Sequence, residues 1–229
     1  MKKSNKNLLI VAAHADDEVL GCFGTVARLI NEGYSAYTLI LGEGKTSRDE
    51  KRDVDNQKDA IDALNQEIKK SNDTIGIKNV FLENFPDNRF DHVDLLDIVK
   101  RVSNVIEKVN PEIIFTHYEN DLNIDHKLTF RAVLTATRPM KNQVVKKIYS
   151  FEILSSTEWK FPLSFSPDTF FDISETIDLK IKAMNEYQSE LMDYPHPRSI
   201  EGIKLNAKYH GMRTGIEYAE AFKTIRVIK

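Results

Sequence analysis

NLLIVAAHADDE, residues 7–18, places an apolar run directly before a cluster of ionisable side chains. The run Asn7–Ala13 has the length and composition of a strand that is buried inside a parallel sheet. His14, Asp16 and Asp17 follow at its carboxyl end. In open α/β sheets, ligands bind beyond the carboxyl ends of the strands. The stretch therefore predicts a buried parallel strand with a polar site at its end.

Similar apolar runs recur through the first two thirds of the chain, separated by amphipathic stretches. The pattern predicts further strands over residues 35–41, 79–83, 112–117 and 147–153. It predicts helices over residues 18–31, 50–70, 93–109 and 126–137. Strands that alternate with helices form βαβ units. The sequence therefore predicts an α/β fold: a Rossmann-like, mostly parallel sheet with helices on both faces.

The last third of the chain has a different pattern. Residues 160–167 (KFPLSFSP) indicate an extended loop, and residues 176–190 and 200–211 indicate helices. Residues 222–228 predict a final strand, and Pro195 and Pro197 make the connection between the two helices rigid. We expect one domain over residues 1–229, with a helical extension at its C-terminal end.

The overall composition excludes several classes of protein. The 229 residues carry a net charge of −3, with basic residues scattered, so neither a nucleic-acid partner nor a polybasic membrane anchor is expected. No apolar stretch reaches the length of a membrane span or of a secretory signal, which predicts a cytoplasmic location. Cys22 is the only cysteine, which excludes an intrachain disulfide and a zinc site built from several thiolates.

The residue types after the first strand are those of a catalytic zinc site. Such a site needs three protein ligands, and His14 and Asp17 are three residues apart across a strand-to-helix turn, so both can face one point. Asp16 lies between them, and a carboxylate beside zinc-bound water is what a general base requires. The alternative is that the three acids at residues 16–18 only stabilise a helix start. For Glu18 we retain two interpretations: it stabilises the helix start, or it supports the metal site without binding the metal.

A nucleotide-binding role is poorly supported. Glycines follow the first strand at Gly21 and Gly24, but they come too late and lack the spacing of a dinucleotide fingerprint. Gly42 and Gly44 form a lone GxG, which is a weak signal.

The motif His14–Glu18 (HADDE) resembles the HPDDE motif of the PIG-L/LmbE-like deacetylases, with Ala15 in place of the usual proline. The second motif of that family, a histidine that follows an aspartate at a helix start, resembles Asp125-His126 here. Further similar segments extend the resemblance over nearly the whole chain. They are residues 46–48, 86–88, 151–159, 195–199 and 217–222.

The resemblance implies a mechanism as well as a fold. Zinc would be held by His14, Asp17 and His126, although a site of two histidines and one aspartate also accepts other divalent ions. Asp16 would deprotonate the metal-bound water and then return the proton to the leaving amine. The products would be acetate and a free amino sugar. Relatives often self-associate, so a homo-oligomer stays open.

One departure from the family pattern concerns the catalytic histidine that many members carry three residues before the metal-binding one. Asn123 stands there, and an amide cannot carry a proton at neutral pH. Asp125 would then support His126 from outside the metal shell. We hypothesise that His196, held between two prolines, supplies the missing imidazole. The alternative is that His196 is a surface turn residue.

Several other polar and aromatic residues are candidates for contact with substrate. Arg48 and Asp87 follow the second and third predicted strands, and Trp159 could stack on a sugar ring. Asn123 and Arg198 are also expected to contact the substrate. Ordinary solvated charges, or a core tryptophan with one exposed edge, remain the alternatives. His117, at the end of the fourth predicted strand, is either a fourth ligand or a residue that lines the pocket or packs under the loop.

The predicted function is removal of an N-acetyl group from an amino sugar or glycoside, in glycan, lipopolysaccharide or small-molecule glycoside synthesis. A zinc amidase that acts on a non-sugar amide is the first alternative. A sugar-binding relative without turnover is the second alternative, prompted by Asn123. Asp16 argues against the second alternative, because a pure binder needs no base.

Overall fold

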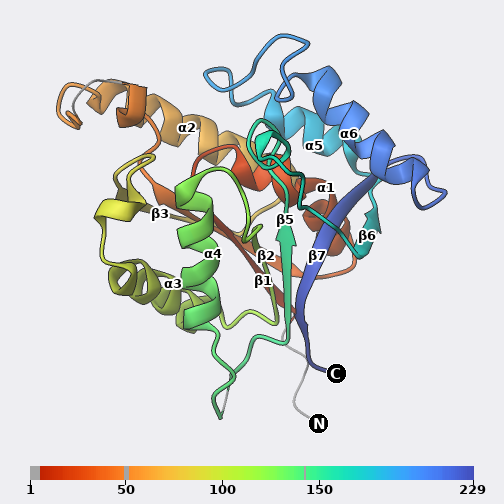
Figure 1. The fold of residues 1–229 in the computed structure, drawn as a ribbon, viewed down its shortest axis with the longest axis horizontal. Coiled ribbons are helices and arrows are strands. Elements are labelled where there is room, and N and C mark those ends of the chain that lie inside the picture. The colour runs from red at the N-terminus through yellow and green to blue at the C-terminus, as the bar shows by residue number, and fades with distance from the viewer. Residues whose placement is uncertain (1–5, 49–51, 142) are drawn as a thin grey trace.

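The computed structural model describes residues 6–48, 52–141 and 143–229, which form one seven-stranded sheet covered by helices on both faces (Figure 1). The strands are β1 (Asn7–Ala12), β2 (Ser35–Gly42), β3 (Asn79–Phe85), β4 (Ile113–His117), β5 (Lys147–Phe151), β6 (Thr169–Asp172) and β7 (Ala219–Val227). The helices are α1 (Asp17–Asn31), α2 (Lys58–Ile75), α3 (Leu95–Val109), α4 (Ile124–Ala136), α5 (Ile177–Met184) and α6 (Ile200–Met212). Short 3₁₀ turns are η1 (Thr46–Arg48), η2 (Phe90–His92) and η3 (Thr157–Trp159).

The strand order is β3-β2-β1-β4-β5-β7-β6. β1 pairs in parallel with β2 on one side and with β4 on the other, so the chain reverses its winding direction at β1. The carboxyl ends of β1 and β4 are therefore neighbours at the point where an open α/β sheet forms its crevice. This topology confirms the predicted mostly parallel, Rossmann-like sheet.

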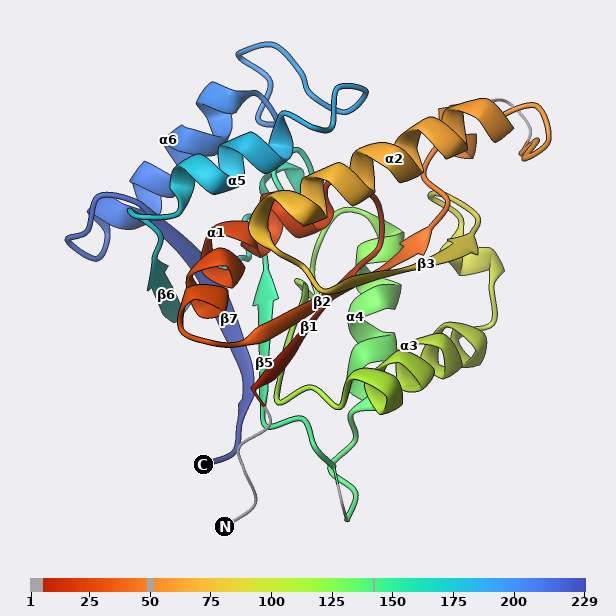
Figure 2. The same cartoon turned by 180° about the vertical axis from the view of Figure 1, so that it is seen from behind.

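β1 is buried on both faces because its side chains alternate between two cores. Leu8, Ile10 and Ala12 pack with α1, α2 and α5, whereas Leu9 and Val11 pack with α3 and α4. Figure 2 shows α1, α2 and α5 together on one side of the sheet and α3 and α4 on the other. An uninterrupted apolar strand is what such two-sided burial requires.

The helix predicted over residues 50–70 begins later, at Lys58. Immediately before it, the Asp53 carboxylate accepts the amide N–H of Asn56, and the Asp53 carbonyl accepts that of Gln57. An aspartate that bonds to the backbone just ahead of it competes with helix formation. These bonds of Asp53, and not a change in the hydrophobic pattern, delay the start of α2.

The C-terminal third contributes strands as well as the predicted helices. β7 pairs antiparallel with β5, and β6 pairs antiparallel with β7 at the sheet edge. The sequence analysis missed β6, because four residues at an edge give little periodicity. The final strand predicted over residues 222–228 is confirmed as β7, whereas β6 adds a second strand to the extension.

A buried ion pair attaches this C-terminal part to α1. Lys180 of α5 donates to Glu220 of β7 at 2.6 Å, and both side chains are about 95% buried. Glu220 also accepts the backbone N–H groups of Gly24 and Thr25 in α1, at 3.0 and 2.7 Å. Lys180 donates in addition to the Leu20 carbonyl, at 2.8 Å. Each charge is thus both paired and hydrogen-bonded, as burial demands.

Candidate active site and metal centre

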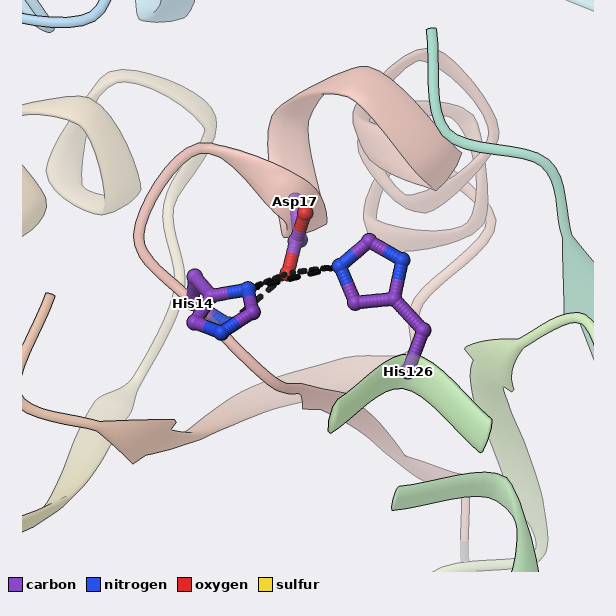
Figure 3. A group of neighbouring side chains, drawn as sticks. All are labelled: His14, Asp17 and His126. Atoms are coloured by element: carbon purple, nitrogen blue, oxygen red, sulfur yellow. Dashed lines mark hydrogen bonds and ion pairs between the residues drawn. The ribbon is translucent and has the colours of Figure 1, made fainter. Parts of the chain in front are cut away.

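Three side chains from two adjacent strand ends converge on one point (Figure 3). His14 follows β1, Asp17 begins α1, and His126 lies in the first turn of α4, which follows β4. The Asp17 Oδ2 atom accepts the backbone N–H of His14 at 2.8 Å, which fixes the carboxylate within the turn. Gly42 makes room at the neighbouring end of β2, because a Cβ there would lie 2.9 Å from the Ala13 carbonyl oxygen.

The spacing of these atoms fits a tetrahedral metal ion. His14 Nδ1 lies 3.4 Å from Asp17 Oδ2 and 3.3 Å from His126 Nε2, and His126 Nε2 lies 3.5 Å from Asp17 Oδ2. A regular tetrahedron with metal–ligand bonds of about 2.05 Å has edges of about 3.3 Å. The separations of these three atoms therefore fit one face of such a tetrahedron, so His14, Asp17 and His126 could hold a zinc ion.

A carboxylate outside this triangle orients His14. The Nε2 of His14 contacts Asp125 Oδ2 at 3.0 Å, and Asp125 Oδ1 accepts the backbone N–H of Phe90 at 2.9 Å. Asp87 Oδ1 lies 3.4 Å from the same His14 nitrogen. A proton on Nε2 leaves the lone pair of Nδ1 free to bind a metal. Asp125 thus supports His14, and not His126 as expected, because its position in the first turn of α4 points it toward β1.

Asp121 occupies the corresponding position beside His126. Its Oδ1 lies 3.1 Å from His126 Nδ1, so the opposite nitrogen, Nε2, faces the other ligands. The hydroxyls of Ser156 and Thr157 donate short hydrogen bonds to the two Asp121 oxygens. Burial raises the pKa of Asp121, but the contacts with His126 and the two hydroxyls outweigh it and lower the pKa to about 2. The carboxylate is therefore ionised when it contacts His126.

The electrostatics of the cluster favour a cation. Burial lowers the pKa of His14, but its hydrogen bonds to Asp125 and Asp17 and the charge of Asp87 outweigh it, so the pKa lies well above its usual value. The pKa of His126 is lowered by burial and raised more strongly by the charge of Asp17 and by Asp121, to about 9. Neighbouring carboxylates that hold protons on two buried imidazoles would also hold a divalent metal.

His117 is fully buried and lies outside the lining of the cavity. Its Nε2 accepts the backbone N–H of Ala13 at 2.8 Å, which occupies that lone pair. Its ring stacks on His126 with centroids 4.0 Å apart. Burial and the charge of His126 keep its pKa well below the usual value, so the ring is neutral. Of the two roles left open by the sequence, packing beside the metal ligands is the one that these contacts favour.

Asp16 faces the pocket from an unusual backbone conformation. Its φ of 79° and ψ of −24° lie in the left-handed region, which costs a non-glycine residue about 1 kcal/mol. Arg198 Nη1 donates to its Oδ2 at 3.1 Å. Burial and the charge of Asp17 raise the pKa of Asp16 well above its usual value, against the opposing charge of Arg198. Strain of this kind is concentrated at functional sites.

A cavity of about 270 Å³ opens beside Asp16 and the metal triangle. Most of its lining is polar. The lining residues are His14, Ala15, Asp16, Asp17, Gly44, Ser47, Asp87, Asn88, Asn123, His126, Ile153, Ser155, Ser156, Glu190 and Arg198. The volume is suited to one sugar unit and not to a large ligand.

The structure brings three of the predicted contact residues, Asp87, Asn123 and Arg198, to the wall of this cavity. Asp87 lines it and accepts the Ser47 hydroxyl at 2.6 Å. Asn123 lines it too, but its side chain accepts the backbone N–H of Asp125 and donates to Asn88. The amide that replaces the family histidine is therefore engaged as the cap of α4. Arg198 lines the cavity through its pair with Asp16.

Other predicted residues lie outside the lining. Trp159 and His196 are absent from it, and their rings meet edge to face with centroids 5.7 Å apart. His196 Nδ1 accepts the backbone N–H of Arg198 at 3.2 Å, so His196 flanks the cavity through its neighbour. The backbone of Arg48 ends η1, but its side chain lies outside the described residues.

The sequence analysis missed several residues of the site. Asp121 lies in a segment without a regular pattern, although it precedes the second motif by only a few residues. The helix predicted over residues 176–190 would end at Glu190, but that helix, α5, ends at Met184. Glu190 accepts from Lys45 at 2.6 Å and lies 3.5 Å from Arg198 Nη1. A buried aspartate in the loop before the ligand-bearing helix was the one available signal. Glu18 is buried outside the cavity lining, where its carboxylate accepts hydrogen bonds from the Tyr187 hydroxyl and the Asn72 amide. It therefore has the supporting position that was one of its two expected roles.

A sequence model of the PIG-L family, described as GlcNAc-PI de-N-acetylase, matches residues 9–137. This span covers more than half of the chain and includes His14, Asp17 and His126. The chain belongs to the PIG-L family of deacetylases. The resemblance seen in its two motifs is thereby confirmed.

Two relatives of this PIG-L protein are similar over most of their length. One is a probable N-acetyl-alpha-D-glucosaminyl L-malate deacetylase 2 from Bacillus cereus, 27% identical over 81% of this chain and 84% of the relative. The other is the diacetylchitobiose deacetylase of Thermococcus kodakarensis, 25% identical over 96% of this chain and 83% of the relative.

One similar solved structure shows that the fold by itself does not identify the reaction. GalB, the 4-carboxy-2-hydroxymuconate hydratase of Pseudomonas putida KT2440, superimposes with a TM-score of 0.77 over 98% of each chain, at 23% identity. The same fold therefore carries a hydratase, and the reaction has to be argued from the site. Within the described parts of this chain, no helix combines the length and apolar character needed to cross a membrane.

Proposed function

We propose that this PIG-L protein is a zinc-dependent hydrolase that removes the acetyl group from an N-acetylated amino sugar or glycoside. The observation that carries the proposal is the triangle of His14 Nδ1, Asp17 Oδ2 and His126 Nε2, with the Asp16 carboxylate beside it in a cavity of one-sugar size. Two relatives named as deacetylases of acetylated sugars, each similar over more than 80% of its length, support the same substrate class.

The donor set favours zinc, although other divalent ions accept two imidazoles and one carboxylate. Zinc supplies Lewis acidity, which polarises a carbonyl oxygen and lowers the pKa of water toward neutrality. His14, Asp17 and His126 would hold it. Asp125 contacts the other ring nitrogen of His14, and Asp121 lies beside the other ring nitrogen of His126, so the ligating nitrogen of each ring is directed at the proposed metal position.

Asp16 is the proposed base and acid. Its carboxylate takes a proton from the attacking water as the water oxygen bonds to the acetamide carbon. It then gives that proton to the amine nitrogen as the C–N bond breaks, so that acetate and a free amine leave. Arg198 holds one Asp16 oxygen at 3.1 Å, which keeps the other oxygen directed at the reacting water. Burial raises the pKa of Asp16, which suits a group that must both accept and donate a proton.

Substrate contacts are proposed for the polar side chains of the cavity wall. Asp87 and Asn123 offer groups for sugar hydroxyls, and Arg198 Nε is buried without a protein partner among the described residues, so it is available as a donor. Arg48 and Trp159 complete the proposed contact set. His196 as the proton donor to the leaving group remains a hypothesis; because His196 flanks the cavity without lining it, Asp16 is the simpler assignment.

The test is acetate release by the zinc-loaded protein over a panel of N-acetyl sugars, nucleotide sugars and glycosides. We expect Asp16→Asn to lower kcat by about 10³-fold while zinc stays bound at one ion per chain. Asp91→Asn is the matched control, since Asp91 is an exposed carboxylate on η2, and it should keep full activity. Zinc bound at full occupancy without release from any sugar would contradict the proposal and favour a non-sugar amide or a binding role.

A further inference from the structure

The cavity accommodates little more than one sugar unit, so the rest of a larger substrate must lie outside it. The segments that border the cavity on the side of α4, η3 and the α5–α6 connection carry large exposed apolar side chains. We call this set the apolar rim; it consists of Leu122, Ile124, Trp159, Phe161, Met192 and Tyr194. We propose, on the basis of the deacetylase function above, that the apolar rim binds an aryl or alkyl group attached to the acetamido sugar.

Four members of the apolar rim lie close in the chain to residues that line the cavity. Leu122 and Ile124 flank Asn123 in the chain. Met192 and Tyr194 lie between two lining residues, Glu190 and Arg198. The exposed fractions of Met192 and Tyr194 are 46% and 59%. The apolar surface is therefore continuous in sequence with the polar wall of the active site.

Trp159 and Phe161 lie on a segment that is held over the end of β4 at both of its ends. At one end, the hydroxyl of Thr157 bonds to Asp121. At the other end, Tyr118, which follows β4, donates its hydroxyl to the Ser164 carbonyl at 2.7 Å. Trp159 and Phe161 between these anchors are 47% and 79% exposed.

The segment that carries Trp159 meets the α5–α6 connection through an aromatic contact. The Trp159 ring lies edge-on to His196, and the His196 ring accepts the backbone N–H of Arg198, which itself bonds to Asp16. Figure 1 shows both segments at the end of the sheet toward which β5 points. Trp159 is therefore connected to Asp16 of the cavity through His196 and Arg198.

The chemistry of the apolar rim favours a nonpolar group over a second sugar. Leu122, Ile124 and Phe161 carry no polar atom and cannot bind hydroxyl groups. By contrast, the opposite wall of the cavity, formed by Ser47, Asp87 and their neighbours, is polar. Exposed apolar surface beside a polar pocket marks a binding site for a ligand that has one polar part and one apolar part.

The test uses the fact that Trp159 is the only tryptophan of the chain, so intrinsic fluorescence reports on this surface alone. The probes are the methyl, hexyl and phenyl glycosides of N-acetylglucosamine, in both anomeric forms, and N,N′-diacetylchitobiose. We expect the hexyl or phenyl glycoside to shift the emission to shorter wavelength and to bind about tenfold more tightly than the methyl glycoside, since several apolar carbon atoms leave water.

Substitutions in the apolar rim test whether its side chains cause this preference for the hexyl or phenyl glycoside. Phe161→Ser with Tyr194→Ser should remove the tenfold preference and leave the methyl glycoside unchanged in affinity and in kcat. Met140→Ser is the matched control: Met140 is 72% exposed and lies in the segment between α4 and β5, at the opposite end of the sheet (Figure 1). It should keep the full preference.

Several outcomes would overturn the inference. Equal affinity for the methyl and hexyl glycosides would do so, as would a preference that survives in the rim variant. Tighter binding of diacetylchitobiose than of either apolar glycoside would assign the surface to a second sugar. Sedimentation with phosphatidylcholine vesicles, without discrimination among soluble glycosides, would assign it to a membrane. Because the titration needs no turnover, these results are separate from acetate release, on which the proposed function itself depends.

Discussion

The loops after β1 and β4 and the region after β5 both contribute to the active site, but they do so in different ways. His14, Asp17 and His126 are fixed by strand ends and helix first turns, and their supporting carboxylates come from the same part of the chain. Arg198 and the apolar rim lie on irregular segments of the later region. Under the proposed function, the early region would supply the metal ligands, whereas the later region would position the base and select the substrate.

The buried ion pair between Lys180 and Glu220 attaches the later region to α1, and breaking this pair is the first test of the two-region comparison. Lys180→Met removes the partner of the buried Glu220 carboxylate, and breaking a buried ion pair in this way should lower the free energy of unfolding by about 3 kcal/mol. The measurement is urea unfolding followed by circular dichroism. The double variant Lys180→Met with Glu220→Gln should recover part of the loss; a single variant as stable as the parent protein would show that the attachment is not needed.

The contact across the two regions at the base should have the next largest effect. Arg198→Ala frees the Asp16 carboxylate from its 3.1 Å contact, and a displaced base should lower kcat by about 100-fold. Zinc affinity should change little, because Arg198 contacts no proposed ligand among the described residues. Arg198→Lys should restore part of kcat. An equal loss of zinc and of activity would contradict the assignment of Arg198 to the base.

A substitution on the metal side should show the opposite pattern. Asp121→Asn alters the carboxylate beside His126 Nδ1 and should weaken zinc binding about tenfold or more, the usual cost of losing such support. The measurement is competition with a chelator of known affinity. Asp97→Asn, on the exposed face of α3, is the control. Unchanged zinc affinity in Asp121→Asn would remove Asp121 from the metal centre.

The smallest effect is expected for His196→Ala. If Asp16 protonates the leaving amine, this variant should keep kcat within about threefold, with any change appearing in KM through the neighbouring Trp159. Steady-state acetate release from a soluble glycoside separates the two constants. A loss of kcat of about 100-fold would instead establish His196 as the proton donor that replaces the family histidine, which this chain lacks at Asn123.

The prediction from sequence was most successful where local pattern and burial coincide. β1 and the helices α1, α3 and α6 lie within one or two residues of the predicted spans, because uninterrupted apolar runs and helical spacing are local properties. Local pattern failed at the start of α2, where the Asp53 side chain bonds to the backbone, and at β6, a short edge strand that depends on β7 for its pairing.

The sequence by itself determined the alternation of strands and helices from β1 to β5 and the two motifs that carry His14, Asp17 and His126. It could do so because residues at the end of one strand or in one helical turn are neighbours in the chain. Only the tertiary structure decided that Asp125 supports His14, that Asp121 lies beside His126, and that Arg198 contacts Asp16. The last pair is 182 residues apart. Such contacts depend on the crossover connections that bring distant segments to one edge of the sheet, and no local pattern records them.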